Sequence, residues 1–104
     1  MSGMLFEKPE SRTAEKAARL ARKERERREA YRLVERRDGY RCRSCGERWT
    51  SGEGHHHLKF RSGGGADTTA NLLLLCQRCH ADVHAYRLTL VGTNANRSLR
   101  FERR

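Results

Sequence analysis

The pattern of apolar and charged positions divides the chain into two parts. Residues 12–37 contain no Gly or Pro and consist mostly of Ala, Arg, Glu and Leu, which are good helix formers. Apolar residues in this segment fall into two groups, 14–21 and 30–34, and every residue of 22–29 between them is charged. Because a helix without an apolar stripe through its middle cannot be buried there, we predict a helix that projects from the rest of the molecule.

Turn residues and short apolar runs replace this pattern after residue 38. Glycine commonly follows the last residue of a helix, so Asp38-Gly39 predicts the helix end. The elements expected beyond it are a strand at 55–60, an apolar run at 72–75, a helix at 76–85 and a terminal hairpin of 86–91 with 98–102. We therefore expect a small α+β protein with a disordered leader at 1–11, a basic helical arm at 12–38 and a folded domain at 39–104.

The charge of the chain narrows its expected partners. Lys and Arg total 23 against 13 acidic residues, a formal charge of +10, and most of the cations are arginines. Arginine forms bidentate contacts with phosphates, so this balance favours nucleic acid, with a ribosome-bound or merely soluble basic protein as the alternative. Neither a signal peptide nor an apolar membrane span is visible, and we expect a reducing, cytoplasmic setting with no membrane partner.

The four cysteines form two short pairs, Cys42-x2-Cys45 and Cys76-x2-Cys79. This spacing lets two thiolates bind one ion from a single turn, and two such pairs complete the closed tetrahedron of structural Zn²⁺. Disulfides, a redox-active pair and an iron–sulfur cluster are disfavoured alternatives in a reducing setting. Because only 36% of the residues are hydrophobic, the small core needs the roughly 10 kcal/mol or more that zinc can contribute.

All five histidines lie in the same window, three in a run at 55–57 and two at His80 and His84. His80 and His84 are four residues apart in the predicted helix, which places them on one face in chelating geometry. Together with the cysteines they exceed what one tetrahedral ion can use. We expect an open metal site beside the closed one, with a purely structural or second zinc site as the alternative.

The order of these residues resembles the HNH endonucleases, which have the ββα-metal (His-Me finger) fold. The resemblance covers residues 35–84 and rests on His56-His57-Leu58, the loop Arg61-Ser62-Gly63-Gly64, Asn71-Leu72 and Cys79-His80, interleaved with the cysteine pairs. Family members often carry Pro where Phe60 stands. The resemblance implies a ββα-metal core stapled by a four-cysteine zinc site, preceded by the long basic helix and followed by the hairpin, with 39–104 as the nuclease domain.

The resemblance also implies roles for individual residues. His57 would be the general base, and Asn71 would brace the loop that orients it, although in some relatives this position contacts the metal. The catalytic divalent cation (Mg²⁺, Mn²⁺, Ni²⁺ or Zn²⁺) would be held by His56, His80 and His84. His55 is left over, and we expect it to be an exposed strand residue.

The expected activity is metal-dependent hydrolysis of DNA phosphodiester bonds, nicking or cutting both strands and leaving 5′-phosphate and 3′-OH ends. An imidazole suits the base at neutral pH, and a divalent cation stabilises the departing oxygen. The alternatives are a non-catalytic, zinc-stabilised nucleic-acid-binding module and a basic structural protein of a ribosome or packaging complex. Either would leave the metal-site histidines without a reaction to serve.

Basic residues outside the metal sites are candidates for phosphate contacts, and each could equally be solvated surface. The candidates are Lys59, Arg61 and Arg78 near the sites and Arg22, Arg25 and Arg28 on the arm. The alternative for the arm is a solvated helix held by pairs such as Glu24–Arg28. One active site per chain means that cutting both strands would need a dimer or two encounters. A homodimer or a larger phage or restriction complex is therefore a candidate assembly, and the expected source is a phage or a bacterium.

Overall fold

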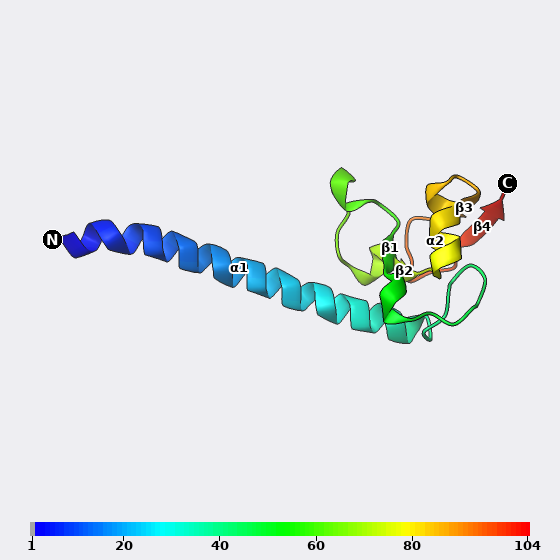
Figure 1. Cartoon of the computed structure of the whole chain (residues 1–104), viewed down its shortest axis with the longest axis horizontal. Helices are drawn as coiled ribbons and strands as arrows, with labels where there is room; N and C mark the ends of the chain where they lie inside the picture. The colour runs from blue at the N-terminus through cyan, green and yellow to red at the C-terminus, as the bar shows by residue number, and fades with distance from the viewer. Residues whose placement is uncertain (1) are drawn as a thin grey trace.

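The computed structural model describes the backbone of residues 2–104 and the side chains of residues 12–104. Two helices, four strands and three short 3-10 turns follow one another in the described chain (Figure 1). In chain order they are α1 (Ser2–Arg37), η1 (Ser51–Glu53), β1 (His55–His57), η2 (Arg61–Gly63), η3 (Thr69–Asn71), β2 (Leu72–Leu74), α2 (Gln77–His84), β3 (Leu88–Val91) and β4 (Arg100–Arg103). The small α+β fold with a long N-terminal helix is confirmed.

Helix α1 projects away from the folded domain as a single rod, and the molecule measures 68 × 25 × 23 Å (Figure 1). Residues 12–26 of the rod are exposed, and within residues 12–37, whose side chains are described, the helix is buried only at Ala30 and Val34, near its C-terminal end. The backbone is already helical at Ser2, whereas the sequence predicts a disordered leader over 1–11; residue 1 lies outside the described residues. Within the described part of the chain, no helix is both long and apolar enough to cross a membrane.

Strands β1 and β2 pair antiparallel, with His55 opposite Leu74 and His57 opposite Leu72. All residues of β2 are buried, because both faces of this strand are covered. Leu72 and Leu74 pack on Val34 of α1 and on Trp49, whereas Leu73 packs with the cysteines, with Leu88 and with Ala95. Helix α2 follows directly, so β1, β2 and α2 form the expected ββα unit.

Strand β1 is shorter than predicted. The sequence suggested a strand over 55–60, but the ladder ends at His57, and the chain then turns into a loop. At this point the backbone N–H of Leu58 donates to the carbonyl of Asn71, and the N–H of Lys59 donates to the Asn71 side chain. A side chain therefore replaces a strand partner, and the pairing cannot continue.

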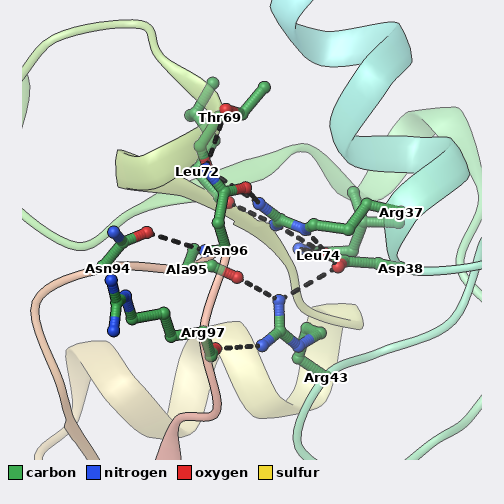
Figure 2. A network of polar contacts seen from close by, with 10 residues as sticks. All are labelled: Arg37, Asp38, Arg43, Thr69, Leu72, Leu74, Asn94, Ala95, Asn96 and Arg97. Atoms are coloured by element: carbon green, nitrogen blue, oxygen red, sulfur yellow. Dashed lines mark hydrogen bonds and ion pairs between the residues drawn. The ribbon is translucent and has the colours of Figure 1, made fainter.

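The C-terminal end of α1 is fixed to the domain by a buried carboxylate (Figure 2). The side chain of Asp38 is only 2% exposed and accepts hydrogen bonds from Arg37, Arg43 and the backbone N–H of Leu74. Arg37 also donates to the carbonyls of Thr69 and Leu72, and Arg43 donates to those of Ala95 and Arg97. The network joins the helix end, β2 and the C-terminal segment.

The chain closes with the antiparallel hairpin of β3 and β4, in which Leu88 lies opposite Arg103. The prediction placed these strands at 86–91 and 98–102, so the hairpin is confirmed with its ends shifted by one or two residues. Leu88 is buried, and Phe101 of β4 packs against the same apolar cluster as the cysteines. The hairpin therefore covers the side of the domain that carries the cysteine cluster.

Candidate functional site

The four cysteines come together as one cluster. Cys42 and Cys45 lie in a turn after α1, Cys76 caps the start of α2 and Cys79 lies in its first turn. All four sulfur atoms lie within 4.8 Å of one another, and none of the thiols forms a disulfide. Tetrahedral zinc with Zn–S bonds of about 2.3 Å places its sulfurs about 3.8 Å apart. The donor set and its spacing are therefore consistent with a structural zinc site.

The pKa values of the clustered thiols also indicate that a bound cation would stabilise the cluster. Burial raises the pKa of Cys79 to about 12 and raises that of Cys76. Burial acts in the same direction on Cys42, but hydrogen bonds from the backbone of Cys45, Cys76 and Ser44 outweigh it, and the Cys42 pKa is lowered. Four thiolates cannot share so small a space without a compensating charge. A bound divalent cation would provide that charge and deprotonate the remaining thiols.

A second cluster gathers three of the five histidines. His56 reaches from β1, and His80 and His84 reach from successive turns of α2. Their candidate ligand nitrogens lie within 4.8 Å of one another, with His80 Nε2 and His84 Nε2 3.1 Å apart. His84 is exposed, whereas His56 is only 4% exposed. Three protein ligands on a partly open surface are typical of a metal site that keeps a position for water or substrate.

Two histidines of this cluster, His56 and His80, have pKa values that favour the neutral form, which is the form that binds metal. Burial, with smaller contributions from His80 and His84, lowers the pKa of His56 to about 4. Burial and the neighbouring His84 also lower the pKa of His80, partly offset by hydrogen bonding with the backbone of Glu53. At neutral pH both imidazoles are therefore uncharged, and a nitrogen lone pair of each is available to a cation.

His57, the predicted base, lies next to His56 in β1 but has a different environment. Successive side chains of a strand point to opposite faces, and His57 is directed away from the buried position of His56. His57 Nε2 lies 2.8 Å from Asp67 Oδ1, and its side chain is 13% exposed. Asp67 was not among the residues selected from the sequence, because nothing in its spacing distinguishes it from other acidic loop residues.

Asn71, the last residue before β2, joins the two ends of the 58–70 loop, which follows β1. Its Oδ1 accepts from the Lys59 N–H at 2.8 Å, and its Nδ2 donates to the carbonyls of Lys59 at 3.0 Å and Ala66 at 2.9 Å. These contacts are those of a brace. They hold the loop that carries Asp67 against the end of the strand that carries His57.

His55 is not the exposed strand residue that we expected. Its side chain is only 8% exposed, stacks on Tyr31 with ring centroids 3.9 Å apart and lies 2.9 Å from Glu35 Oε2. The edge of Trp49 contacts the same ring. The expectation was wrong because the end of α1 covers this face of β1, a contact between distant segments that local spacing does not reveal. Tyr31 and Glu35 were not predicted to contact this histidine. The only indication in the sequence is their four-residue spacing, which places them on one face of α1.

The candidate phosphate contacts are dispersed rather than gathered. Lys59 and Arg61 lie exposed on the 58–70 loop, and exposed Arg78 on α2 lies 3.6 Å from Glu47. On the arm, Arg28 lies 3.8 Å from Glu24, as the alternative reading of a solvated helix anticipates. A surface hollow on α1 is lined by Arg22, Arg25 and Arg28 together with Arg32, Glu26 and Glu29.

Comparisons with known proteins agree with this geometry. The sequence model of one protein family, described as HNH endonuclease, matches residues 42–85, which contain both clusters. A curated protein from Nostoc sp. (strain PCC 7120 / SAG 25.82 / UTEX 2576), named Anaredoxin, is 36% identical over 59 residues, covering 57% of this chain and 76% of that protein. No solved structure gives a significant match.

Proposed function

Because the chain belongs to the HNH endonuclease family, we propose that it is a metal-dependent endonuclease that hydrolyses DNA phosphodiester bonds. The observation that carries the proposal is the convergence of His56, His80 and His84 within 4.8 Å, beside a histidine already bonded to a carboxylate. The net charge of +10 supports a polyanionic substrate. The products would be 5′-phosphate and 3′-hydroxyl ends.

In this proposal His57 is the general base. Ionised Asp67 can only accept a hydrogen bond, so it favours the tautomer in which His57 Nε2 carries the proton. Nδ1 then keeps its lone pair and takes the proton from the water that attacks the phosphorus. A fixed ring orientation also keeps this lone pair aimed at one point, which is the usual benefit of a carboxylate behind a catalytic histidine.

His56, His80 and His84 would hold the catalytic divalent cation. When bound, the cation supplies positive charge that stabilises the transition state at phosphorus and the departing 3′ oxygen. Imidazole ligands favour Ni²⁺ or Zn²⁺ in affinity over Mg²⁺ or Mn²⁺, so the identity of the ion depends on availability as well as on the site. The protein's own contribution is to keep His56 neutral and buried and to orient the two α2 histidines on one helical face.

Structural zinc at the four cysteines would hold the catalytic residues in place. Cys79 and His80 are neighbours in α2 but would serve different ions. Bound zinc would fix the N-terminal turn of α2 to the turn at Cys42 and Cys45, and would thereby fix the direction of His80 and His84. One chain carries one such centre, so cleavage of both strands would require two nicking events or a dimer.

A plasmid assay tests the proposal. The zinc-loaded protein is incubated with supercoiled plasmid and a series of Mg²⁺, Mn²⁺, Ni²⁺ and Zn²⁺ concentrations, and conversion to nicked and linear forms is followed. Cleavage with at least one added ion, absent in the His80→Ala variant, is the expected result. The second candidate is a non-catalytic binding module, which the net charge of +10 supports as well. DNA binding without cleavage under every ion would establish the second candidate and exclude the first.

A further inference from the structure

A cleft separates helix α1 from the 58–70 loop. Its volume is about 290 Å³, and it is lined by Leu20, Lys23, Glu24 and Arg27 of the helix and by Arg61 and Asp67 of the loop. The helix residues are spaced by three and four and therefore form one face. Figure 1 shows the loop on the side of the domain from which α1 projects. The cleft thus lies between the arm and the loop that holds His57.

The charges in this cleft favour an anion. Glu24 lies 3.8 Å from Arg28, and Asp67 is engaged by His57 at 2.8 Å and by Arg61 at 3.7 Å. Among the side chains of residues 12–104, neither Lys23 nor Arg27 has an ion-pair partner within 4 Å. Both acids are therefore engaged, whereas two cations on the helix wall are available to a ligand.

The position of the cleft connects it to the reaction. Asp67 lines the cleft and bonds His57 Nε2, so a single residue separates the cleft from the proposed base. Its volume corresponds to about ten water molecules, which suits a phosphate with part of its sugar rather than a stacked base pair. A strand whose scissile phosphate lies at His57 would carry a neighbouring phosphate toward this cleft.

The opposite face of the arm differs from the cleft because no loop of the domain lines the hollow there. The hollow lined by Arg22 and Arg25 also contains Glu26 and Glu29, and it is formed by α1 alone. On a helix with 3.6 residues per turn, Arg22 and Arg25 point away from the face that carries Lys23 and Arg27. Arg22 and Arg25 were predicted to contact phosphates, but of these two faces of the arm only the one with Lys23 and Arg27 lies opposite residues of the folded domain.

We propose that the cleft of Lys23, Arg27 and Arg61 binds a DNA backbone phosphate that flanks the scissile one. The arm then acts as one wall of the substrate channel, and it contacts DNA through the Lys23 and Arg27 face. The inference rests on the proposed function, because the channel leads to His57 only if that residue is at the reacting centre. It goes further by naming the side of the arm that contacts the substrate.

Binding measurements with two matched double variants test this inference. The Lys23→Ala/Arg27→Ala variant and the Arg22→Ala/Arg25→Ala control each remove two cations from the same exposed stretch of helix and introduce the best helix former. Both are made in the zinc-loaded His80→Ala chain, which keeps the His57–Asp67 contact, and the affinity for a labelled DNA duplex is measured by fluorescence anisotropy from low to moderate salt. Circular dichroism checks that the helix content of both variants is unchanged.

The cleft variant should bind about tenfold more weakly than its parent, and the slope of log affinity against log salt should fall by about one, for the one phosphate contact that is lost. The control should lose threefold or less. Equal losses in the two variants, or no loss in the cleft variant, would overturn the proposal. The binding readout distinguishes the two failures. A wild-type chain that never cuts plasmid refutes the nuclease proposal even if the cleft variant binds DNA more weakly, and unchanged binding by the cleft variant refutes this inference even if the wild-type chain cuts.

Discussion

At the scale of residues, three adjacent histidines of β1 have three different environments. His55 is buried against α1, His56 reaches the helix α2 histidines and His57 bonds a loop carboxylate. The alternation of a strand separates His56 from its two neighbours, so adjacent positions can serve packing, metal binding and proton transfer. In the proposed mechanism Asp67 would determine which His57 nitrogen is free, and this role leads to a specific prediction.

Replacing Asp67 by asparagine should reduce kcat by about 10- to 100-fold with KM for DNA nearly unchanged. The amide can donate to His57 Nε2 as well as accept, so it no longer favours the tautomer with a free Nδ1. Initial-rate kinetics on a nicking substrate measures both constants. Glu24→Gln is the control, since it neutralises an acid in the same cleft without contact to His57. If Asp67→Asn changes only KM, or matches Glu24→Gln, the carboxylate does not position the base.

At the scale of elements, the sequence predicts the helices, strands and turns that carry the candidate metal ligands, but it does not predict how these elements contact one another. The helix of 12–37 and the hairpin follow from periodicity and turn residues, which are local properties, whereas the ββα order follows from the resemblance to the HNH endonucleases. The cysteine pairs and the His80–His84 spacing could likewise be found from the sequence. The burial of His55, the early end of β1 and the position of Asp67 depend on how distant segments pack, and a single sequence does not record that packing.

The attachment of α1 to the domain should depend strongly on Asp38. Asp38→Ala leaves the half-buried cations of Arg37 and Arg43 without their carboxylate and should lower the free energy of unfolding by about 3 kcal/mol. The exposed pair Arg100–Glu102 provides the comparison, and Glu102→Ala should cost about 0.5 kcal/mol. Urea denaturation followed by Trp49 fluorescence measures both. Similar losses in the two variants would show that the buried network does not anchor the helix.

At the scale of the whole molecule, a rod-like basic helix and a small domain are joined at one end of the rod. The domain has two apolar clusters, one under α1 and one around the cysteines, and β2 contributes to both. With so small a core, the cysteine site would contribute much of the stability, on the order of 10 kcal/mol for structural zinc. Loss of zinc should therefore release α2 and the histidines on it together.

Substitutions at two adjacent positions of α2 distinguish the role of the cysteine site from that of the histidine site. Cys79→Ser should lower the zinc content, reduce Tm and abolish Ni²⁺ binding, because the helix that carries His80 and His84 loses its anchor. His80→Ala should keep one zinc per chain and nearly the parent Tm while losing the second ion. Elemental analysis, thermal unfolding and calorimetric titration with Ni²⁺ measure the three properties. Retention of full Ni²⁺ affinity by a zinc-free Cys79→Ser chain would contradict the dependence of one site on the other.

The most direct test of the account compares the wild-type chain with His57→Ala on one DNA substrate under the ion that supports cleavage. Single-turnover cleavage should fall by about 100-fold or more, the usual contribution of a general base. DNA affinity and Tm should remain at the wild-type level, because His57 is neither a proposed metal ligand nor part of either apolar cluster. Cleavage by His57→Ala at the wild-type rate would contradict the assignment of the base and with it the proposed mechanism.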